Sequence, residues 1–472
     1  MEIKLHNTLT QQIEPLKPVA PDGVVRMYCC GPTVYSYAHI GNLRSYLFED
    51  ILRKAIVKAG FKIKHVMNIT DVGHLTSDAD SGDDKMLLAA EKEKKSVMEI
   101  ARKYEDKFFE HSKALNIARP DIVCRATEHV SDMIKFVETL EEKGYAYFSN
   151  GNVYFDTSKF KDYGRLSGQR REDLKHGARI EEDSNKRNPS DFVLWFTTSK
   201  FKDQILQWDS KWGRGYPGWH IECSTMSVKY LGEHLDIHCG GIDHIAVHHE
   251  NEIAQSEAFL GHKWCNMWLH GEFLQMKNDV KMSKSKGNTL TLDTLIEHGY
   301  SPLHYRYLVL TSHYRAPLVF SYDNLDAAAS AYAKLKAKYA EFLAAPKQDI
   351  SPEDEKLYEQ YVAEFDGYIL SDLKTSQALA LLWKVVKDKD FPPALKVKFI
   401  DNAEQIFSLD LAKQDQAKAL QIDDEIQSLI DQRKQARQNK DWKKSDEIRD
   451  CLLQKGIMVK DLPNGEVEVS LK

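Results

Sequence analysis

The sequence predicts an α/β protein: a parallel-sheet domain interrupted by an insertion, then an α-helical bundle, then a small α/β C-terminal domain. Three observations support this prediction. A strand, a helix and a second strand follow one another near the N-terminus. Apolar residues keep a helical period from about residue 323 to residue 411. The chain closes on two apolar segments around Pro463-Asn464-Gly465, which is typical of a β-hairpin.

The N-terminal elements form one βαβ unit. Residues 24–29 are an apolar run that predicts a buried strand, and residues 61–69 predict a second one. Between them, apolar residues recur at helical spacing from Leu43 to Ala55, and Gly60 ends the helix. The strands should be parallel with a right-handed crossover, as in a Rossmann-like domain. The sequence has no Gly-x-Gly-x-x-Gly fingerprint here, so a dinucleotide site is not supported.

The rest of the chain divides by composition and periodicity. Residues 85–140 have a helical, charged pattern, and residues 145–200 predict strands and loops with a turn at 149–151. Prolines at 346 and 392–393 break the later helical region into a bundle. We therefore expect these parts: 1–119, first half of the catalytic nucleotide-binding domain; 120–215, insertion; 216–320, second half; 321–412, helical bundle; 413–472, small domain.

Composition fits a soluble enzyme of the cytoplasm. The 472 residues are 42% hydrophobic and 29% charged, and no apolar run approaches the length of a membrane span. The N-terminus has no apolar signal segment. Seven scattered cysteines predict reduced thiols and a metal site rather than a disulfide framework. The net charge of −6 means that a polyanionic partner must meet local basic patches.

Two short segments predict an ATP site. Residues 281–288 read Lys-Met-Ser-Lys-Ser-Lys-Gly-Asn, a cationic loop suited to a polyphosphate leaving group. By itself this loop has a less favoured alternative, a solvated surface turn. Residues 39–42 read His-Ile-Gly-Asn at the start of the first helix, where free N–H groups favour triphosphate. Together the segments resemble the KMSKS and HIGH signatures of class I aminoacyl-tRNA synthetases, with Asn42 where the last His usually stands.

A second group of residues suggests a metal site. His248 and Glu252 are four residues apart, which places them on one face of a helix. Cys223 and the Cys29-Cys30 pair offer thiolates from elsewhere in the chain. The spacing alone leaves two alternatives open, a tetrahedral zinc site or a surface His–Glu pair.

Longer motifs narrow the family. Met-Tyr-Cys-Cys-Gly-Pro-Thr-Val-Tyr at 27–35, Gly-Trp-His-Ile-Glu-Cys-Ser at 218–224 and His-His-Glu-Asn-Glu-Ile-Ala-Gln-Ser at 248–256 resemble cysteinyl-tRNA synthetases. Asn-Ile-Thr-Asp at 68–71 and the segment at 187–195 extend the match. The resemblance covers residues 1–320 and, more weakly, the C-terminal parts.

The resemblance implies one Zn²⁺ per chain, held by Cys30, Cys223, His248 and Glu252. Cys30 is preferred to Cys29 because it directly precedes the Gly-Pro-Thr-Val-Tyr segment. Neighbouring side chains of a strand point to opposite faces, so only one of the two thiols should point into the pocket. Cys239 stands where a glycine is common in the family, and we expect it to be a small core residue. We also expect Cys124, Cys265 and Cys451 to be small core residues.

The resemblance also implies the reaction. ATP with Mg²⁺ would activate L-cysteine to cysteinyl-adenylate, and the 3′ terminal adenosine of tRNA(Cys) would then accept the amino acid. His39 and Asn42 would act on the triphosphate, and Lys284 with Lys281 on the leaving pyrophosphate. The remaining residues implied at the sites are Pro32, Gly41, Gly241 and Asp243 for ATP, Thr70, Trp219 and His238 for the amino acid, and Arg437, Trp442, Asp446 and Asp461 for the anticodon.

Two other functions are weighed against this one. A cysteine-activating ligase with a small-molecule amine acceptor would not need the roughly 150 residues after residue 320. A non-catalytic zinc protein that binds RNA would have no use for both ATP segments. We expect a monomer that charges tRNA and does not associate with a membrane.

Overall fold

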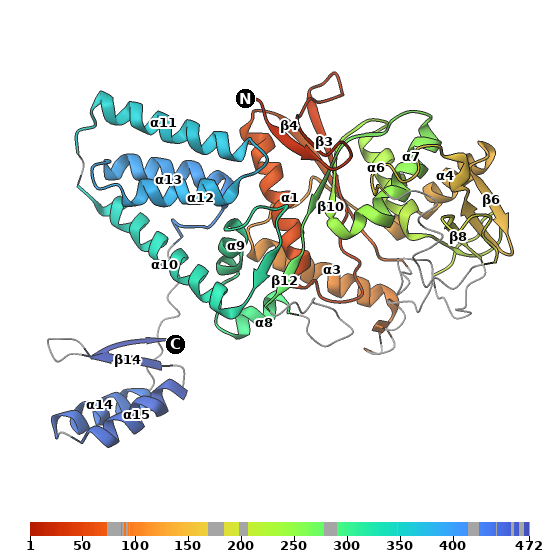
Figure 1. The fold of residues 1–472 in the computed structure, drawn as a ribbon. Helices are drawn as coiled ribbons and strands as arrows, with labels where there is room; N and C mark the ends of the chain where they lie inside the picture. Colours follow the sequence, from red (N-terminus) through yellow and green to blue (C-terminus); the bar gives the residue numbers. More distant parts are fainter. Residues whose placement is uncertain are drawn as a thin grey trace. The chain divides into compact units, whose positions relative to one another are not determined.

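The computed structural model describes residues 1–72, 86, 89–90, 93, 95–168, 184–197, 206–277, 290–346, 348–413, 424–439, 441–454, 457–461 and 467–471. They form two compact units, Met1–Leu409 and Asp410–Lys472. Each unit is described by itself (Figure 1). Within these residues, no helix combines the length and the apolar character that a bilayer crossing requires.

The core of the first unit is a five-stranded parallel sheet with the strand order β11-β10-β3-β4-β5. Its strands are β3 (Val24–Cys29), β4 (Lys62–Ile69), β5 (Ile122–Arg125), β10 (Leu235–Gly241) and β11 (Cys265–Gly271). Successive strands extend the sheet in one direction from β3 to β5, and β10 then pairs on the other side of β3. Open α/β sheets bind ligands at the carboxyl ends of the strands where the order reverses, here between β3 and β10.

The predicted βαβ unit is confirmed. Helix α1 (Ile40–Lys58) joins β3 to β4, and its apolar stripe from Leu43 to Ala55 is buried against the sheet. Gly60 follows the helix with a φ of 97°, a conformation that suits glycine. Helix α3 (Val97–Ala114) then leads to β5.

Strand β5 corrects the sequence analysis, which expected helix throughout residues 85–140. It is only four residues long and pairs in parallel with β4. A segment this short has too few residues to show a strand period beside the helical patterns on both sides.

Helix α4 (Val130–Glu142) lies in the stretch predicted to be helical, and an antiparallel sheet begins in the stretch 145–200, which was predicted to be strand and loop. The sheet consists of β6 (Ala146–Ser149), β7 (Asn152–Phe155), β8 (Phe192–Phe196) and β9 (Tyr216–Pro217). The predicted turn lies between β6 and β7, where Asn150 and Gly151 have φ values of 43° and 91°. The five-part domain division stays a prediction, and β5 belongs to the parallel sheet although residues 120–215 were assigned to the insertion.

The second half of the parallel-sheet region carries the helices that bear the site residues. They are α6 (Trp219–Leu231), the π-helical turn η4 (Ile245–His249) and α7 (Glu250–Leu260). The remaining short elements are β1 (Lys4–Asn7), β2 (Gln12–Pro15), β12 (Leu274–Met276), β13 (Leu318–Phe320), α8 (Leu292–Glu297) and α9 (Pro302–Leu310).

The predicted helical bundle is present. Its helices are α10 (Tyr322–Ala344), α11 (Pro352–Ile369), α12 (Thr375–Lys387) and α13 (Pro393–Phe407). Helix α10 ends just before Pro346, and α13 begins at Pro393, as the proline breaks predicted.

The second unit contains α14 (Asp424–Gln438), α15 (Trp442–Gln454) and the strands β14 (Ile457–Asp461) and β15 (Val467–Leu471). The strands pair antiparallel with Ile457 opposite Leu471 and Asp461 opposite Val467. This confirms the predicted hairpin and the small α/β domain.

Candidate metal centre and active-site cleft

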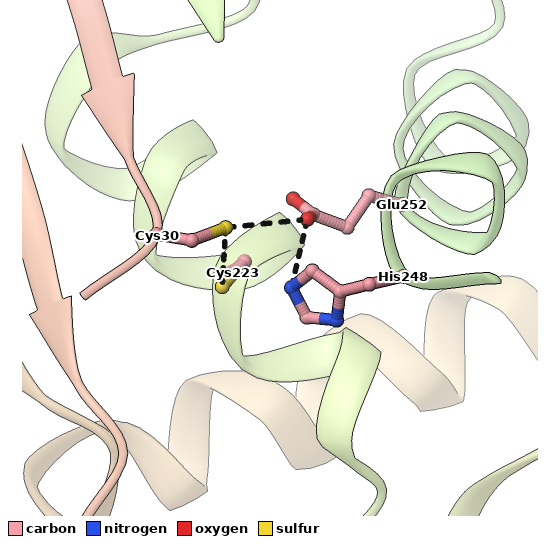
Figure 2. Close-up of side chains that lie close together, drawn as sticks. All are labelled: Cys30, Cys223, His248 and Glu252. Carbon is pink, nitrogen blue, oxygen red and sulfur yellow. Dashed lines mark hydrogen bonds and ion pairs between the residues drawn. The ribbon is translucent and has the colours of Figure 1, made fainter. Parts of the chain in front are cut away.

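Four buried side chains from separate elements meet beside the carboxyl end of β3 (Figure 2). Cys30 directly follows β3, Cys223 lies on α6, His248 on η4 and Glu252 on α7. Their ligand atoms all lie within 4.8 Å of one another. The fold therefore brings together residues that are up to 222 positions apart in the sequence.

The distances are close to those around a small tetrahedral ion, two of them slightly longer and one slightly shorter. Cys30 Sγ lies 3.9 Å from Cys223 Sγ and 3.9 Å from Glu252 Oε1, and His248 Nε2 lies 3.0 Å from Glu252 Oε1. Zinc–ligand bonds of about 2.0–2.3 Å in a tetrahedron place ligand atoms roughly 3.3–3.8 Å apart. Two thiols, an imidazole and a carboxylate are also the donor types that zinc takes in proteins.

Strand geometry separates the two neighbouring thiols. Cys29 is opposite Cys239 in the register of β3 and β10, and both residues are completely buried. Cys30, one residue later, lies beside Cys223, with the two sulfur atoms 3.9 Å apart. The buried position of Cys239 is what we expected of a small core residue.

A second layer of side chains orients the candidate ligands. His238 Nε2 lies 2.9 Å from Glu252 Oε2, and His220 Nδ1 lies 3.0 Å from His248 Nδ1. Such partners fix the orientation and tautomer of metal ligands. The resemblance implied His238 at the amino-acid site. In the structure it contacts Glu252 Oε2, whereas Glu252 Oε1 faces Cys30 and His248.

The other residues implied for the amino acid lie close by. The ring centroid of Trp219 is 4.2 Å from that of His248. The Thr70 hydroxyl donates to Glu222 Oε2 at 2.8 Å, and the Thr70 N–H donates to the Pro32 carbonyl at 3.1 Å. Trp219 therefore forms a wall of the metal centre, while the Thr70 hydroxyl is already engaged with a buried carboxyl group.

Sequence reasoning did not assign His249 a role at the site. Its Nε2 lies 3.4 Å from Cys30 Sγ, and its Nδ1 lies 2.8 Å from His270 Nε2. Cys30, His238, His249 and Glu252 form a second group that could hold an ion. The signal in the sequence was the His248-His249 pair, but helical spacing alone would turn the two rings apart. The structure places both residues on η4, a π-helical turn of the kind often found at functional sites, with their ring centroids 5.7 Å apart.

The four candidate ligands differ in the protonation state that their surroundings favour. Burial raises the pKa of the Cys30 thiol, and although burial lowers the pKa of His248, the neighbouring Glu252 and Cys223 raise it to about 10. Burial raises the pKa of Glu252, but the charges and hydrogen bonds of His238 and His248 outweigh it and lower the pKa to about 2. Burial likewise raises the pKa of the Cys223 thiol, but the hydrogen bond with Cys30 and the nearby His248 lower it to about 6. A metal ligand must be deprotonated, and these two groups already favour that form.

A cleft opens next to Cys30 at the carboxyl ends of β3 and β10. It encloses about 160 Å³ and is lined by residues of the β3–α1 loop, α1, α3 and the end of β10. The residues implied for ATP that line it are Pro32, Asn42, Gly241 and Asp243. Cys30 lines it too, so the cleft and the metal centre share a wall.

The start of α1 differs from the sequence-based expectation. We expected free N–H groups there, but His39 Nδ1 accepts the Asn42 N–H at 3.0 Å, and Asn42 Oδ1 accepts the His39 N–H at 3.3 Å. The Ile40 N–H donates to the Leu290 carbonyl at 2.8 Å. The N–H groups of His39, Ile40 and Asn42 are therefore already paired, and since His39 Nδ1 accepts, its Nε2 carries the hydrogen. A Cβ on Gly41 would come within 3.0 Å of His39 Nδ1, so this cap favours glycine.

Not every site residue implied by the resemblance belongs to the described part of the chain. Lys281 and Lys284 lie outside the described residues. In the second unit, the Arg437 guanidinium lies 5.4 Å from the ring centroid of Trp442, which is 56% exposed. Asp446 pairs with Arg449 at 3.1 Å, and Asp461 is the last residue of β14. An exposed aromatic ring beside a guanidinium is suited to stack on an RNA base.

Comparison with known proteins agrees with these observations. Residues 16–330 match the family described as the tRNA synthetases class I (C) catalytic domain, and residues 420–466 match the cysteinyl-tRNA ligase anticodon binding domain. A cysteine–tRNA ligase of Treponema denticola is 48% identical, over 98% of this chain and 98% of its own length. Cysteine–tRNA ligase 1 of Burkholderia lata is 44% identical, over 99% and 96%.

Solved structures agree in fold alone. Methionyl-tRNA synthetase of Mycobacterium tuberculosis, bound by methionyl-adenylate, has a TM-score of 0.56 at 14% identity, over 82% of this chain and 88% of that one. A leucyl enzyme of Agrobacterium radiobacter, in a ternary complex described as LeuRS-tRNA-LeuAMS, has a TM-score of 0.57 at 11% identity, over 84% of each chain. From its catalytic motifs to its C-terminal unit, this chain belongs to the cysteinyl-tRNA synthetase family of class I tRNA synthetases.

Proposed function

We propose that this chain, which charges tRNA(Cys) with cysteine as its family does, selects the amino acid through a zinc ion held by Cys30, Cys223, His248 and Glu252. The observation that supports this most is the buried four-ligand cluster, whose distances suit a tetrahedral zinc ion. The shared wall at Cys30 would bring the side chain of bound cysteine to this cluster and its carboxylate into the cleft.

The chemical difficulty of the reaction explains why a metal is useful. Cysteine and serine differ by one atom, and a pocket that reads shape alone separates such analogues by only about 1–3 kcal/mol. The ion, when bound, favours the thiolate of cysteine over the alcohol of serine, which has a much higher pKa. Selection by this chemistry would make a separate proofreading site unnecessary.

The residues around the ion would orient it and the substrate. His238 and His220 fix Glu252 and His248, and Trp219 excludes water from one side of the centre. In the cleft, Asp243 and Gly241 would receive the adenosine, with Pro32 beside them. His39, Gly41 and Asn42 at the start of α1 would face the triphosphate, and Lys281 and Lys284 the leaving pyrophosphate. Catalysis of phosphoryl-type transfer is mainly positioning and charge neutralisation.

One assay tests the proposal. The purified chain should exchange pyrophosphate into ATP when cysteine is present, should not do so with serine, and should then charge tRNA(Cys). Metal analysis should find one zinc per chain. A protein that contains no zinc and still discriminates cysteine from serine would overturn the proposal.

The KMSKS segment gives a separate prediction. Lys284→Ala should reduce cysteine-dependent ATP–pyrophosphate exchange at least about tenfold, because a lysine neutralises charge on the departing phosphates. Lys286→Ala in the same segment is the matched control and should have a smaller effect. Near-normal exchange in Lys284→Ala would show that another group neutralises the pyrophosphate.

A spectroscopic prediction concerns Glu252. Cys30, Cys223, His248 and Glu252 would together supply the four ligands that zinc usually takes, so the sulfur of cysteine would reach the ion only if one of these side chains gave way or a fifth ligand were accepted. We expect Glu252 to be the ligand that loosens, because it is the hard oxygen donor and its second oxygen is already held by His238. In cobalt-substituted protein, cysteine should add a thiolate absorption band and serine should not. If cysteine leaves the spectrum unchanged, sulfur does not reach the ion.

A monomeric state and a cytoplasmic location also stay predictions.

A further inference from the structure

A second cavity lies beside the active-site cleft, between α1, β4, α3 and the segment 116–120. We call it the α1–α3 cavity. It encloses about 690 Å³, a volume within the range of about 300–1,000 Å³ that is usual for pockets that bind small molecules. Tyr46, Glu49 and Phe108 line both this cavity and the cleft. A ligand in the α1–α3 cavity would therefore contact the wall of the cleft without entering it.

Glu49 brings an uncompensated carboxyl group to this shared wall. The residue is 2% exposed, and neither of its oxygen atoms has a hydrogen-bond partner of ordinary geometry among the described residues. Burial raises the pKa of Glu49 to about 8, and the Cys29 thiol, a weak donor, opposes this only in part. Buried polar groups are normally paired, so this carboxyl group is available to a ligand that brings its own donors.

His65 offers a hydrogen-bond donor on the strand side of the α1–α3 cavity. It is 3% exposed, and its Nδ1 lies 3.4 Å from Arg53 Nη1. A guanidinium group only donates, so Nδ1 accepts and Nε2 carries the hydrogen, for which the described residues supply no partner. Burial and then the charge of Arg53 lower the pKa of His65 to about 3, so the ring is neutral. The cavity thus has a buried acceptor at Glu49 and a buried donor at His65.

The other charged side chains that line the cavity are compensated or exposed. Asp50 accepts from Lys54 Nζ at 2.6 Å and from Arg306 Nη2 at 2.7 Å. Arg53 Nη2 lies 2.7 Å from Asp121 Oδ1. The remaining charges are two acidic and two basic side chains on the exposed side of the cavity: Asp106, Glu110, Lys113 and Arg119. A cation inside the cavity would therefore be attracted chiefly to Glu49.

Aromatic and apolar side chains form much of the remaining lining. The rings of Tyr46 and Phe108 pack edge to face with their centroids 4.8 Å apart. Met67 on β4 and Ile117 in the segment 116–120 line other sides of the cavity. Aromatic faces attract both flat rings and cations, so this lining suits an aromatic body that carries a cationic group.

We propose that the α1–α3 cavity is a second ligand site, which binds a small aromatic amidine or amine with its cationic group on Glu49. Two parallel N–H groups of an amidinium would donate to the two oxygens of Glu49, the geometry of a bidentate ion pair. The ring would lie against Tyr46 and Phe108, and an acceptor elsewhere on the ligand would take the hydrogen of His65 Nε2. The site is separate from the ATP, cysteine and metal sites, so the inference goes beyond the proposed function.

Benzamidine is the probe for this site, and benzamide, which has nearly the same shape but no charge, is its control. An NMR titration of the full chain should give a Kd of about 1 mM for benzamidine, as expected for a ligand of this size. Benzamide should bind at least about tenfold more weakly, because it cannot form the charge-assisted pair. Equal binding of the two compounds, or no binding of benzamidine at about ten times this Kd, would overturn the proposal.

Glu49→Gln tests the proposed partner, and Glu110→Gln is the matched control. The first variant should weaken benzamidine binding at least about tenfold, since an amide cannot pair with the cation. Glu110 lines the same cavity but is exposed and pairs with Lys107 Nζ at 2.7 Å, so its replacement should leave binding unchanged. Equal affinities of the two variants for benzamidine would contradict the role of Glu49.

Ile117→Trp decides the question if Glu49→Gln does not fold. It keeps every charge, fills part of the α1–α3 cavity, and lies on a segment that does not line the active-site cleft. Benzamidine binding should be lost, while cysteine-dependent ATP–pyrophosphate exchange should stay close to normal. Unaltered binding in this variant would place the probe elsewhere and overturn the proposal.

ATP distinguishes the α1–α3 cavity from the cleft. As the ATP concentration rises, the apparent Kd of benzamidine should level off within about threefold of its starting value, because ligands at two sites influence each other only by a finite coupling. A Kd that rises without limit would mean that both compete for the cleft, and would overturn the proposal. The titrations without ATP need no catalysis, so absence of exchange in the unmodified chain would contradict the proposed function alone.

Discussion

Cysteine-dependent ATP–pyrophosphate exchange should fall by about 1000-fold when Cys223 is replaced by serine, and the zinc content should fall with it. Loss of a group that only orients a metal ligand typically costs 10–100-fold, so loss of a ligand should cost more. Cys223 is 1% exposed and its sulfur lies 3.9 Å from Cys30 Sγ, so a water molecule cannot readily take the place of its thiolate as a ligand. A hydroxyl in its place is a poor zinc ligand at neutral pH because it holds its proton.

Cys124→Ser is the matched control for this substitution. Cys124 is also buried, and its sulfur contacts the Met67 carbonyl at 3.6 Å, but it is not one of the four clustered ligands. The hydroxyl of serine can donate to the same carbonyl, so exchange and zinc content should stay close to normal. If Cys223→Ser retains zinc and activity while its fold is intact, Cys223 is not a ligand.

A chain that ends after residue 412 should keep exchange within about twofold and lose about 100-fold in kcat/KM for tRNA(Cys). The first unit, Met1–Leu409, contains the cleft and the four clustered ligands, while the second unit carries the match to the anticodon binding domain. Stacking contributes about 1–3 kcal/mol per base, so two lost bases account for a loss of this size. Equilibrium binding of tRNA(Cys) should weaken in parallel.

The single substitution Trp442→Ala separates base stacking from the loss of the whole unit. Trp442 is 56% exposed beside Arg437, and its removal should lower kcat/KM for tRNA about tenfold without affecting exchange. Lys434→Ala, on the preceding helix, is a control that removes a charge but no ring. If the truncated chain charges tRNA(Cys) as well as the full chain, the C-terminal unit does not contribute to recognition.

Much of the fold could be predicted because its patterns are local. The strand from Val24 to Cys29, helix α1 and its end at Gly60 follow from apolar spacing and a glycine with positive φ. The terminal hairpin and the proline breaks of the bundle are also properties of neighbouring residues. Strand β5 was missed because four residues do not establish a period, and only pairing with β4 makes them a strand.

The candidate site divides in the same way. The candidates Cys30, Cys223, His248 and Glu252 could be named from the motifs, and the position of Cys30 directly before the Gly-Pro-Thr-Val-Tyr segment favoured it over Cys29. The approach of His249, which lies on a π-helical turn, to Cys30 brings together residues 219 positions apart, and an i,i+4 spacing cannot predict it. The capping of α1 by His39 and Asn42 was likewise missed, because both side chains could as well have pointed to phosphate.

The sequence by itself thus determined the family to which the chain belongs and which residues are candidates for its chemistry. Only the tertiary structure decided the hydrogen-bond partners of buried groups. His238 contacts Glu252, the Leu290 carbonyl accepts the first N–H of α1, and Lys54 donates to Ser408 just after α13. The physical reason is that residue type and spacing set which donors and acceptors exist. The pairing of buried polar groups depends on which distant segments the fold brings within about 3 Å of each other.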